Sequence, residues 1–458
     1  TVPGDAVPLV SAPWPAGWLL VLLGAVTVLL TGWGEVLSGA ASVVKNRRVW
    51  NESRVISGAE TTQVFGAAGF GLGGGRALIV WIDSALTAPQ IFGRVVTSAG
   101  PIGPILPIST RKAPAVSITT LSGGANEEGE VVFFWSEFDG ATHTTRATTF
   151  SGGAIDYFEE TLYSGPDSVG GFSAAVAPDG SAVVLYILEN TIPSGDSTIA
   201  HYFRPAAGFS GPVDIDDDLI DVVIALGTAA TYFDGQFRAA WFSLNGPTLQ
   251  VSSFDPAGKS WASPVTVGTQ MNTGAGDTTL IFADSAGGLG LFWIYLTGTT
   301  DEIRATRLSS GSWTPEETVY SSGFEYDRLL GAPSGDGSVV LNVRNTSPDD
   351  DVIEVYGPGS ASGPLDPISV APGSQGQNVA ADGRGGVFVA SFETDSSVAI
   401  NKRLDPGEYG RQFVVEGGVA GPAIPAITGT GDGEIIVAYF PTVSDVAIRG
   451  FGSPESQF

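Results

Sequence analysis

The chain contains no cysteine and only two histidines, His143 and His201, among its 458 residues. Disulfide bonds, thiolate metal sites and cysteine nucleophiles are therefore excluded. Two imidazoles are also too few to build a histidine-rich zinc site from this chain alone. The absence of cysteine is consistent with an exported protein that avoids oxidation.

Positive charge is scarce as well. The chain has 21 Lys and Arg residues, only four of them Lys, against 48 Asp and Glu residues, so its formal net charge is −27. Nucleic acids attract clusters of Lys and Arg, and we therefore exclude nucleic acid as a main partner. Apolar residues make up 43% of the chain, which is enough for a large core and argues against intrinsic disorder.

Eight copies of one short pattern organise the sequence: a glycine, a run of mostly β-forming residues, and usually an aromatic residue. The glycines are 48 to 55 residues apart, and a fixed period near this length is typical of repeat architectures. They are Gly75, Gly129, Gly180, Gly235, Gly287, Gly337, Gly385 and Gly433. Six residues after each glycine stand Trp81, Trp135, Tyr186, Trp241, Trp293, Val343, Ser391 and Tyr439. We expect the aromatic residues to pack between repeats rather than to form a sugar-binding ladder.

Each repeat contains the signals of four strands. In one repeat, residues 277–284, 289–295 and 302–308 and a fourth run that ends at Val319 are bounded by Gly, Pro, Asp or Ser turns. Other third strands are predicted over Gln90–Val96, Thr142–Thr149, Thr248–Phe254, Val398–Leu404 and Asp445–Phe451, and other fourth strands over Phe158–Tyr163, Ala262–Val267 and Arg411–Val415. The pattern predicts an all-β, eight-bladed β-propeller with four antiparallel strands per blade. Seven blades are the alternative if one repeat is a false match.

The two ends of the repeat region fit together. The last repeat stops after its third strand, near Phe451, and residues 49–56 are similar to the fourth strand at Trp313–Tyr320. We therefore predict a propeller over residues 46–458 in which residues 49–56 complete the last blade. Such closure removes exposed strand edges.

The first part of the chain differs from the repeats. We expect an extended segment over residues 1–15 and one long hydrophobic α-helix over residues 16–45, since no charge occurs between Asp5 and Glu35. Residues 16–44 as a helix would be about 43 Å long, and its apolar part could cross a bilayer core of about 30 Å. A membrane anchor, a cleaved signal peptide and an assembly helix are the three interpretations. The layout of an apolar helix before a β-rich head resembles that of pilin-like subunits, which implies a filament.

One turn resembles a known family. Residues Ser253–Trp261 (SFDPAGKSW) match the Asp box of sialidase-like propellers, Ser-x-Asp-x-Gly-x-x-Trp, with one residue inserted, and Ser310–Trp313 retains its tail. In that family the box is a folding element, so the resemblance implies the fold and not the activity. Sialidase chemistry needs an arginine triad and a Tyr–Glu pair at the central channel. Only Glu325–Arg328 brings a carboxylate, a phenol and a guanidinium close together, and we do not expect it to be catalytic.

The densest acidic run supplies the candidate metal ligands. Asp214, Asp216 and Asp218 could contribute oxygen ligands to Ca²⁺, although the run matches no EF-hand loop. A solvated acidic loop is the plainer interpretation. No other cofactor is indicated.

These observations favour a non-catalytic structural or scaffold protein of the cell envelope. It would be anchored or polymerised through residues 16–45, which would contact other copies of the chain or a membrane or surface complex. The propeller would present an interaction face. The alternative is a carbohydrate-binding propeller or a sialidase-like glycoside hydrolase, with glycans as partners.

Overall fold

The computed structural model describes most of the repeat region, and the hydrophobic segment over residues 16–45 lies outside the described residues. The described residues are 49–58, 61, 63–84, 89–113, 115–189, 197–215, 227–243, 248–269, 279–283, 288–296, 301–321, 326–333, 338–345, 351–356, 360–361, 377–382, 384, 386–392, 397–405, 408–415 and 425–452. Across these ranges there is no helix long and apolar enough to cross a membrane. The predicted membrane or assembly helix therefore stays a prediction.

The described residues form an all-β propeller of antiparallel sheets, which we call blades 1 to 8 in chain order. Blade 1 contains β3 (Val64–Gly71), β4 (Arg76–Asp83), β5 (Gln90–Thr97) and β6 (Gly100–Pro107); blade 2 contains β7 (Ser117–Ala125), β8 (Val131–Phe138), β9 (His143–Ser151) and β10 (Ala154–Gly165). Blade 3 contains β11 (Ser168–Val176), β12 (Ala182–Glu189), β13 (Ser197–Arg204), β14 (Gly208–Phe209) and β15 (Val213–Asp214). Blade 4 contains β16 (Ala229–Phe233), β17 (Gln236–Ser243), β18 (Thr248–Asp255), β19 (Ser260–Trp261) and β20 (Val265–Thr269).

The second half of the ring repeats this order. Blade 5 contains β21 (Thr279–Ala283), β22 (Leu289–Leu296), β23 (Asp301–Ser309), β24 (Ser312–Trp313) and β25 (Glu317–Ser321); blade 6 contains β26 (Tyr326–Pro333), β27 (Ser338–Asn345), β28 (Asp351–Tyr356) and β29 (Ser360–Ala361). Blade 7 contains β30 (Gln377–Ala381), β31 (Val387–Phe392), β32 (Val398–Asp405) and β33 (Glu408–Val415). Blade 8 contains β34 (Ala426–Gly429), β35 (Ile435–Thr442) and β36 (Asp445–Gly452), with β1 (Val49–Trp50) and β2 (Arg54–Val55) paired to β36.

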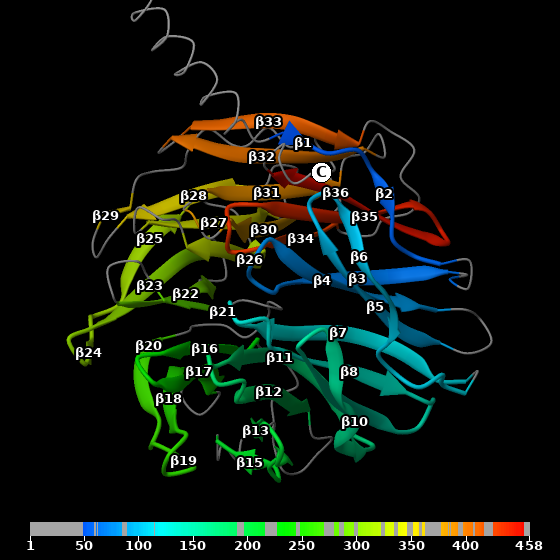
Figure 1. Ribbon diagram of the computed structural model, residues 1–458. Helices are drawn as coiled ribbons and strands as arrows, with labels where there is room; N and C mark the ends of the chain where they lie inside the picture. Colours follow the sequence, from blue (N-terminus) through cyan, green and yellow to red (C-terminus); the bar gives the residue numbers. More distant parts are fainter. Residues whose placement is uncertain are drawn as a thin grey trace, which may run out of the picture. The chain divides into compact units, whose positions relative to one another are not determined.

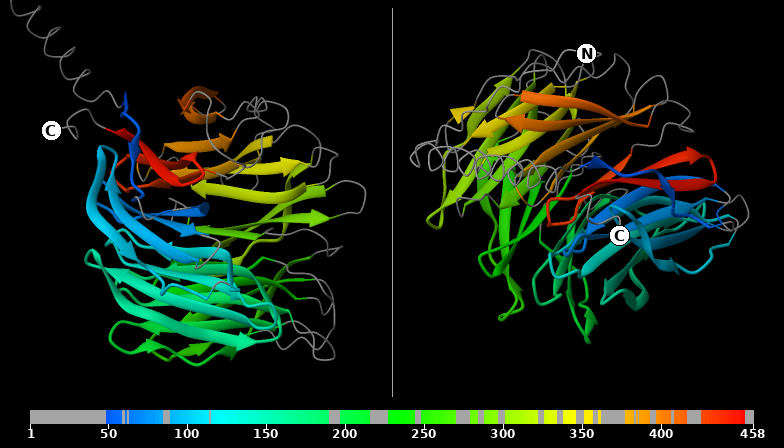
Figure 2. Two further views of the ribbon diagram at one scale, coloured as in Figure 1. Left: turned by 90° about the vertical axis from the view of Figure 1, so that its right-hand side faces the viewer. Right: turned by 45° about the horizontal axis from the view of Figure 1, so that its top comes forward.

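The first strand of each blade faces the axis of the ring. These inner strands contact one another in the order β3, β7, β11, β16, β21, β26, β30 and β34, and β34 contacts β3 again (Figure 1). Residues from the start of the repeat region complete the last blade, as Figure 2 shows, where the blue β1 and β2 lie beside the red β36. The Asn51 N–H donates to the Gly450 carbonyl at 2.8 Å, and the Trp50 and Phe451 rings are 5.3 Å apart.

The repeated glycines and aromatic residues have the roles that the sequence predicts. All five anchor glycines in the described ranges are left-handed, for example Gly180 with φ of 79° and Gly433 with φ of 82°, which a tight turn between two strands requires. Trp81 is fully buried and packs against Ile436 and Ile448 of blade 8. Each of the other repeated tryptophans is also buried at a contact with the preceding blade: Trp135, Trp241 and Trp293. The preference for packing over a sugar-binding ladder is confirmed.

The outer strands differ from prediction in one respect. A single fourth strand over Ala262–Val267 was expected in blade 4, but the structure has two short strands, β19 and β20, on either side of Pro264. Proline has no N–H to donate to a strand ladder, so it interrupts the pairing. Pro212 and Pro315 divide the outer strands of blades 3 and 5 in the same way. The predicted third strands agree with the structure to within two residues at each end.

Candidate functional site

The residues that the sequence proposed as sites do not come together in the described part of the chain. Asp214 ends β15 and is exposed, whereas Asp216 and Asp218 lie outside the described residues. No group of three or more His, Asp or Glu side chains that could hold a metal occurs within the ranges described. The calcium site therefore remains a prediction.

The residues around Arg328 that the sequence suggested as a cluster do not form one site in the described part of the chain. Glu325 lies outside the described residues, and Arg328 lies in β26, opposite Arg344 of β27. Tyr326 is 2% exposed and belongs to the apolar cluster between blades 5 and 6, where its ring stacks on Tyr320 at 6.2 Å. The phenol of this cluster is thus a packing group between two blades.

A groove runs along the outer edges of blades 3 and 4, and its lining residues come from β13, β14 and β15 and from β18 and β19. Its volume is about 720 Å³. Its floor is aromatic: the Tyr202 and Phe254 rings are 4.6 Å apart, and the Phe254 and Trp261 rings are 5.2 Å apart. Phe254 is buried, whereas Tyr202 and Trp261 are half-buried residues of the lining. Concave aromatic surfaces with a few polar groups are typical of ligand sites.

The polar groups at the rim of the groove are mostly donors. Arg204 and Lys259 are exposed and line it from opposite blades, and Asp214 is the single carboxylate among its lining residues in the described ranges. The Asp-box turn holds Lys259, because its N–H donates to the Asp255 carbonyl at 2.7 Å and fixes a left-handed φ of 53°. The Asp255 carboxylate accepts from the Ala257 N–H at 2.9 Å. Asp255 thus holds the turn, as the resemblance to the Asp box implies, and the turn also forms one wall of the groove.

A buried polar chain supports the groove from behind. His201 Nε2 is 3.1 Å from the Tyr186 hydroxyl, and His201 Nδ1 is 3.0 Å from the carbonyl oxygen of Ser210, a residue of the groove wall. Burial lowers the pKa of His201, because the charged imidazolium is poorly solvated there, although the bond to Ser210 opposes this shift. Burial raises the pKa of Tyr186. The neutral imidazole can therefore donate through Nδ1 and accept from Tyr186.

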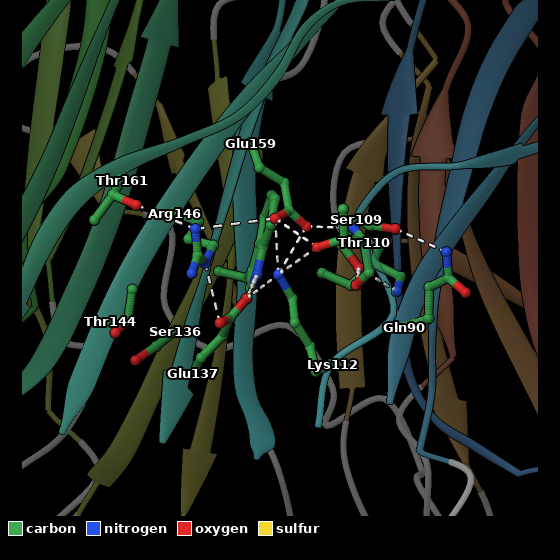
Figure 3. Close-up of polar contacts among 12 residues, drawn as sticks. Gln90, Ser109, Thr110, Lys112, Ser136, Glu137, Thr144, Arg146, Glu159 and Thr161 are labelled. Carbon is green, nitrogen blue, oxygen red and sulfur yellow. Dashed lines mark hydrogen bonds and ion pairs between the residues drawn. The ribbon is translucent and has the colours of Figure 1, made fainter. Parts of the chain in front are cut away.

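A second group of polar residues lies between blades 1 and 2 (Figure 3). We call Lys112, Glu137, Arg146 and Glu159 the buried clamp. Lys112 Nζ lies 2.8 Å from Glu137 Oε1 and 2.8 Å from Glu159 Oε1, and each of these three side chains is 7% exposed. Arg146 Nε lies 3.0 Å from Glu137 Oε2. Two acidic and two basic side chains thus balance one another, and no space for a substrate separates them.

The buried clamp also fixes the link that leads from blade 1 to blade 2. The carboxylate of Glu159 in β10 accepts from the backbone N–H of Thr110, and it accepts from the Thr110 hydroxyl at 2.8 Å. Glu137 accepts from Trp135 Nε1 at 2.7 Å. Sequence reasoning missed this cluster. The one available signal was Lys112 itself, since only four lysines occur in the chain.

A similar but more open arrangement, which we call the open clamp, joins blades 4 and 5 through Thr269, Glu302, Arg304 and Glu316. Glu316 accepts from the Thr269 N–H at 2.8 Å and from Arg304, whose Nη1 is 2.8 Å from Glu316 Oε1. Its charged side chains are 17% to 29% exposed. The two clamps hold neighbouring blades together, and we assign them no binding role.

The chain matches no protein-family model and no curated protein in sequence. Among solved structures, it is similar to the β-propeller domain of the Trilobed protease from Pyrococcus furiosus, with 8% identity and a TM-score of 0.44 over 85% of this chain and 96% of that one. The Hadza microbial sialidase Hz136 is 12% identical, with a TM-score of 0.41 over 72% of this chain and 78% of its own. The Aleuria aurantia lectin, a six-bladed β-propeller, is 13% identical, with a TM-score of 0.39 over 68% of this chain and 96% of its own. At such low identities these likenesses concern the fold, and they carry no argument about activity.

Proposed function

We propose that this chain is a non-catalytic structural or scaffold protein of the cell surface, and that its propeller presents the groove between blades 3 and 4 as a binding face. The observation that carries this proposal is the chemistry of the groove lining. Its half-buried rings and donors suit recognition, whereas the described lining residues include one arginine and no glutamate, and sialidase chemistry needs an arginine triad and a Tyr–Glu pair. Asp214 is the single carboxylate among those lining residues that the structure describes.

The second part of the proposal concerns residues 16–45. Their apolar sequence favours a membrane anchor or an assembly helix, which would place the propeller at the cell envelope and join it to other copies of the chain or to a surface complex. The residues that close the ring begin at Val49, so a chain without residues 1–45 keeps β1 and β2. Anchoring can therefore be removed while the blade contacts are left in place.

Two measurements test the two parts separately. Incubation of the full chain with sialyl and neutral oligosaccharides should release no sugar, and Glu325→Gln and Arg328→Ala should leave this result unchanged. Turnover that either variant abolishes would refute the non-catalytic proposal. Electron microscopy and membrane flotation should find assemblies or membrane association for the full chain and neither for the chain without residues 1–45. Assemblies that survive the deletion would refute the role of this segment.

A further inference from the structure

The lining of the groove between blades 3 and 4 offers hydrogen-bond donors that no described residue uses. The side chains of Arg204 and Lys259, the Tyr202 hydroxyl and the Trp261 indole N–H make no hydrogen bond or ion pair with any residue in the described ranges. Ser260 adds an exposed hydroxyl beside Trp261. A ligand that satisfied this set would have to be rich in acceptor oxygens.

The charge of the groove contrasts with the charge of the chain. The chain carries −27 overall, yet among the described lining residues Arg204 and Lys259 stand against one carboxylate, Asp214. The guanidinium of Arg204 can bind a carboxylate through two parallel N–H groups, and Lys259 can add a point charge. A long polyanion would be repelled by the rest of the surface, so the ligand that fits is short and carries few carboxylates.

The shape of the groove distinguishes a sugar from a peptide. Peptides that add a strand to a sheet need a long free edge, but the outer strands that line the groove, β14, β15 and β19, are each two residues long. The half-buried rings of Tyr202 and Trp261 instead offer flat faces next to polar groups. A pyranose ring has the matching form, with an apolar C–H face and oxygens around its edge.

We propose that this groove binds a short acidic saccharide built of uronic-acid residues, with sugar rings on Trp261 and Tyr202 and carboxylates at Arg204 and Lys259. This assignment rests on the proposed binding function and names the class of ligand. Titration calorimetry of the full chain with trigalacturonate tests it. The fully methyl-esterified trisaccharide is the matched probe, because it keeps the rings and hydroxyls and lacks the charges.

Trigalacturonate should bind, and its methyl ester should bind at least about tenfold more weakly, because charge-assisted hydrogen bonds are lost. Trp261→Ala should weaken binding by about tenfold or more, as expected for a central aromatic contact. Trp313→Ala is the control, since Trp313 follows the equivalent turn in blade 5 and lies outside the groove. Arg204→Gln and Lys259→Gln should each weaken binding of the acid and leave binding of the ester unchanged, whereas Arg384→Gln, at a turn in blade 7, should change neither.

Each other outcome overturns the inference. Equal binding of acid and ester would remove the role of charge, and equal loss in Trp261→Ala and Trp313→Ala would place the site elsewhere. If neither probe binds at millimolar concentration while an acidic peptide does, the ligand class is wrong. Failure of the proposed function gives a different result. Cleavage of bound trigalacturonate would refute the non-catalytic role and leave the ligand class intact. If groove variants reduce attachment to a surface partner and the groove binds no sugar, the ligand class is refuted and the binding function stands.

Discussion

The buried clamp between blades 1 and 2 and the open clamp between blades 4 and 5 both join neighbouring blades through ion pairs, but their charged side chains are buried to different degrees. In both, a glutamate accepts from the N–H and hydroxyl of a threonine of the preceding blade or link: Glu159 of β10 from Thr110, and Glu316, just before β25, from Thr269 at the end of β20. Arg146 and Arg304 each stand 11 residues after the repeated tryptophan of their blade. The shared geometry shows that blade docking itself creates this position for an ion pair.

The difference lies two residues after the repeated tryptophan. Blade 2 has Glu137 there, which is buried and brings Lys112 with it, whereas blade 5 has Tyr295, whose ring is covered by the Arg304 guanidinium at 3.2 Å. A buried ion pair is costly to break, because the remaining charge has no solvent, while an exposed pair contributes little. Glu137 therefore makes the ion pairs of the buried clamp interdependent, because removal of one charged side chain leaves another buried charge without a partner.

Removing Lys112 should have the largest effect on this comparison. Lys112→Met leaves Glu137 and Glu159 buried with only Arg146 to balance them, and should lower the free energy of unfolding by about 3–5 kcal/mol. Urea unfolding followed by tryptophan fluorescence measures this loss. The triple variant Lys112→Met, Glu137→Gln, Glu159→Gln should recover much of it, because it buries no unpaired charge. A single-variant loss below about 1 kcal/mol would contradict the assignment of a buried, interdependent clamp.

The regular part of the fold could be predicted from the sequence because its signals are local. A turn glycine and an aromatic residue six positions later define a strand pair within one repeat, as Gly129 and Trp135 do. The split outer strands were missed although Pro264 was visible, since proline is tolerated in edge strands and its effect depends on the neighbouring ladder.

The sites were harder to predict, because they join residues from different blades or links. Glu159 reaches Thr110 across 49 positions, and the groove is lined by Tyr202 and Trp261, which belong to neighbouring blades. Their proximity follows from how far one blade is rotated from the next, which no local pattern records. The Asp box indicated the turn that carries Lys259, but not that this turn faces a groove.

A comparison of Trp135 with Trp241 distinguishes the stability that comes from a hydrogen bond to the buried clamp from the stability that comes from packing. Both indoles are fully buried, but Trp135 Nε1 donates to Glu137 at 2.7 Å, whereas Trp241 Nε1 has no partner in the described ranges. Both Trp→Phe changes remove similar volume. Trp135→Phe should therefore cost more than Trp241→Phe by about 1.5–3 kcal/mol, the contribution of a hydrogen bond to a charged group. Equal losses in urea unfolding would show that the bond to Glu137 adds no stability.

His201 is a buried titratable group that is neutral, unlike the charged side chains of the two clamps. Its pKa is lowered by burial from the ordinary value of 6.5, so the unfolded chain takes up a proton at a higher pH than the folded chain. Stability should therefore fall as the pH drops below about 6.5, by at most about 1.4 kcal/mol per pH unit from this group. Carboxylates also titrate below that range, so the measured quantity is the difference between the parent chain and His201→Gln. Urea midpoints that change in parallel from pH 7.5 to pH 5 would contradict the assignment.

The open clamp should give the smallest effect. Glu316→Gln keeps an acceptor for the Thr269 N–H but removes the ion pair with Arg304, whose side chain is 17% exposed. Because water reaches this partly buried pair, we expect it to contribute about 1 kcal/mol or less, and salt to screen it. The loss in free energy of unfolding should therefore stay below that value. It should shrink further in 1 M NaCl, where the screening length is about 3 Å.

Glu159→Gln is the matched change in the buried clamp. It should lower the free energy of unfolding by more and respond less to salt, because Lys112 is shielded from water and ions. If the two glutamines have equal effects and equal salt dependence, burial does not distinguish the clamps, and the presence of Lys112 beside Glu137 needs another explanation.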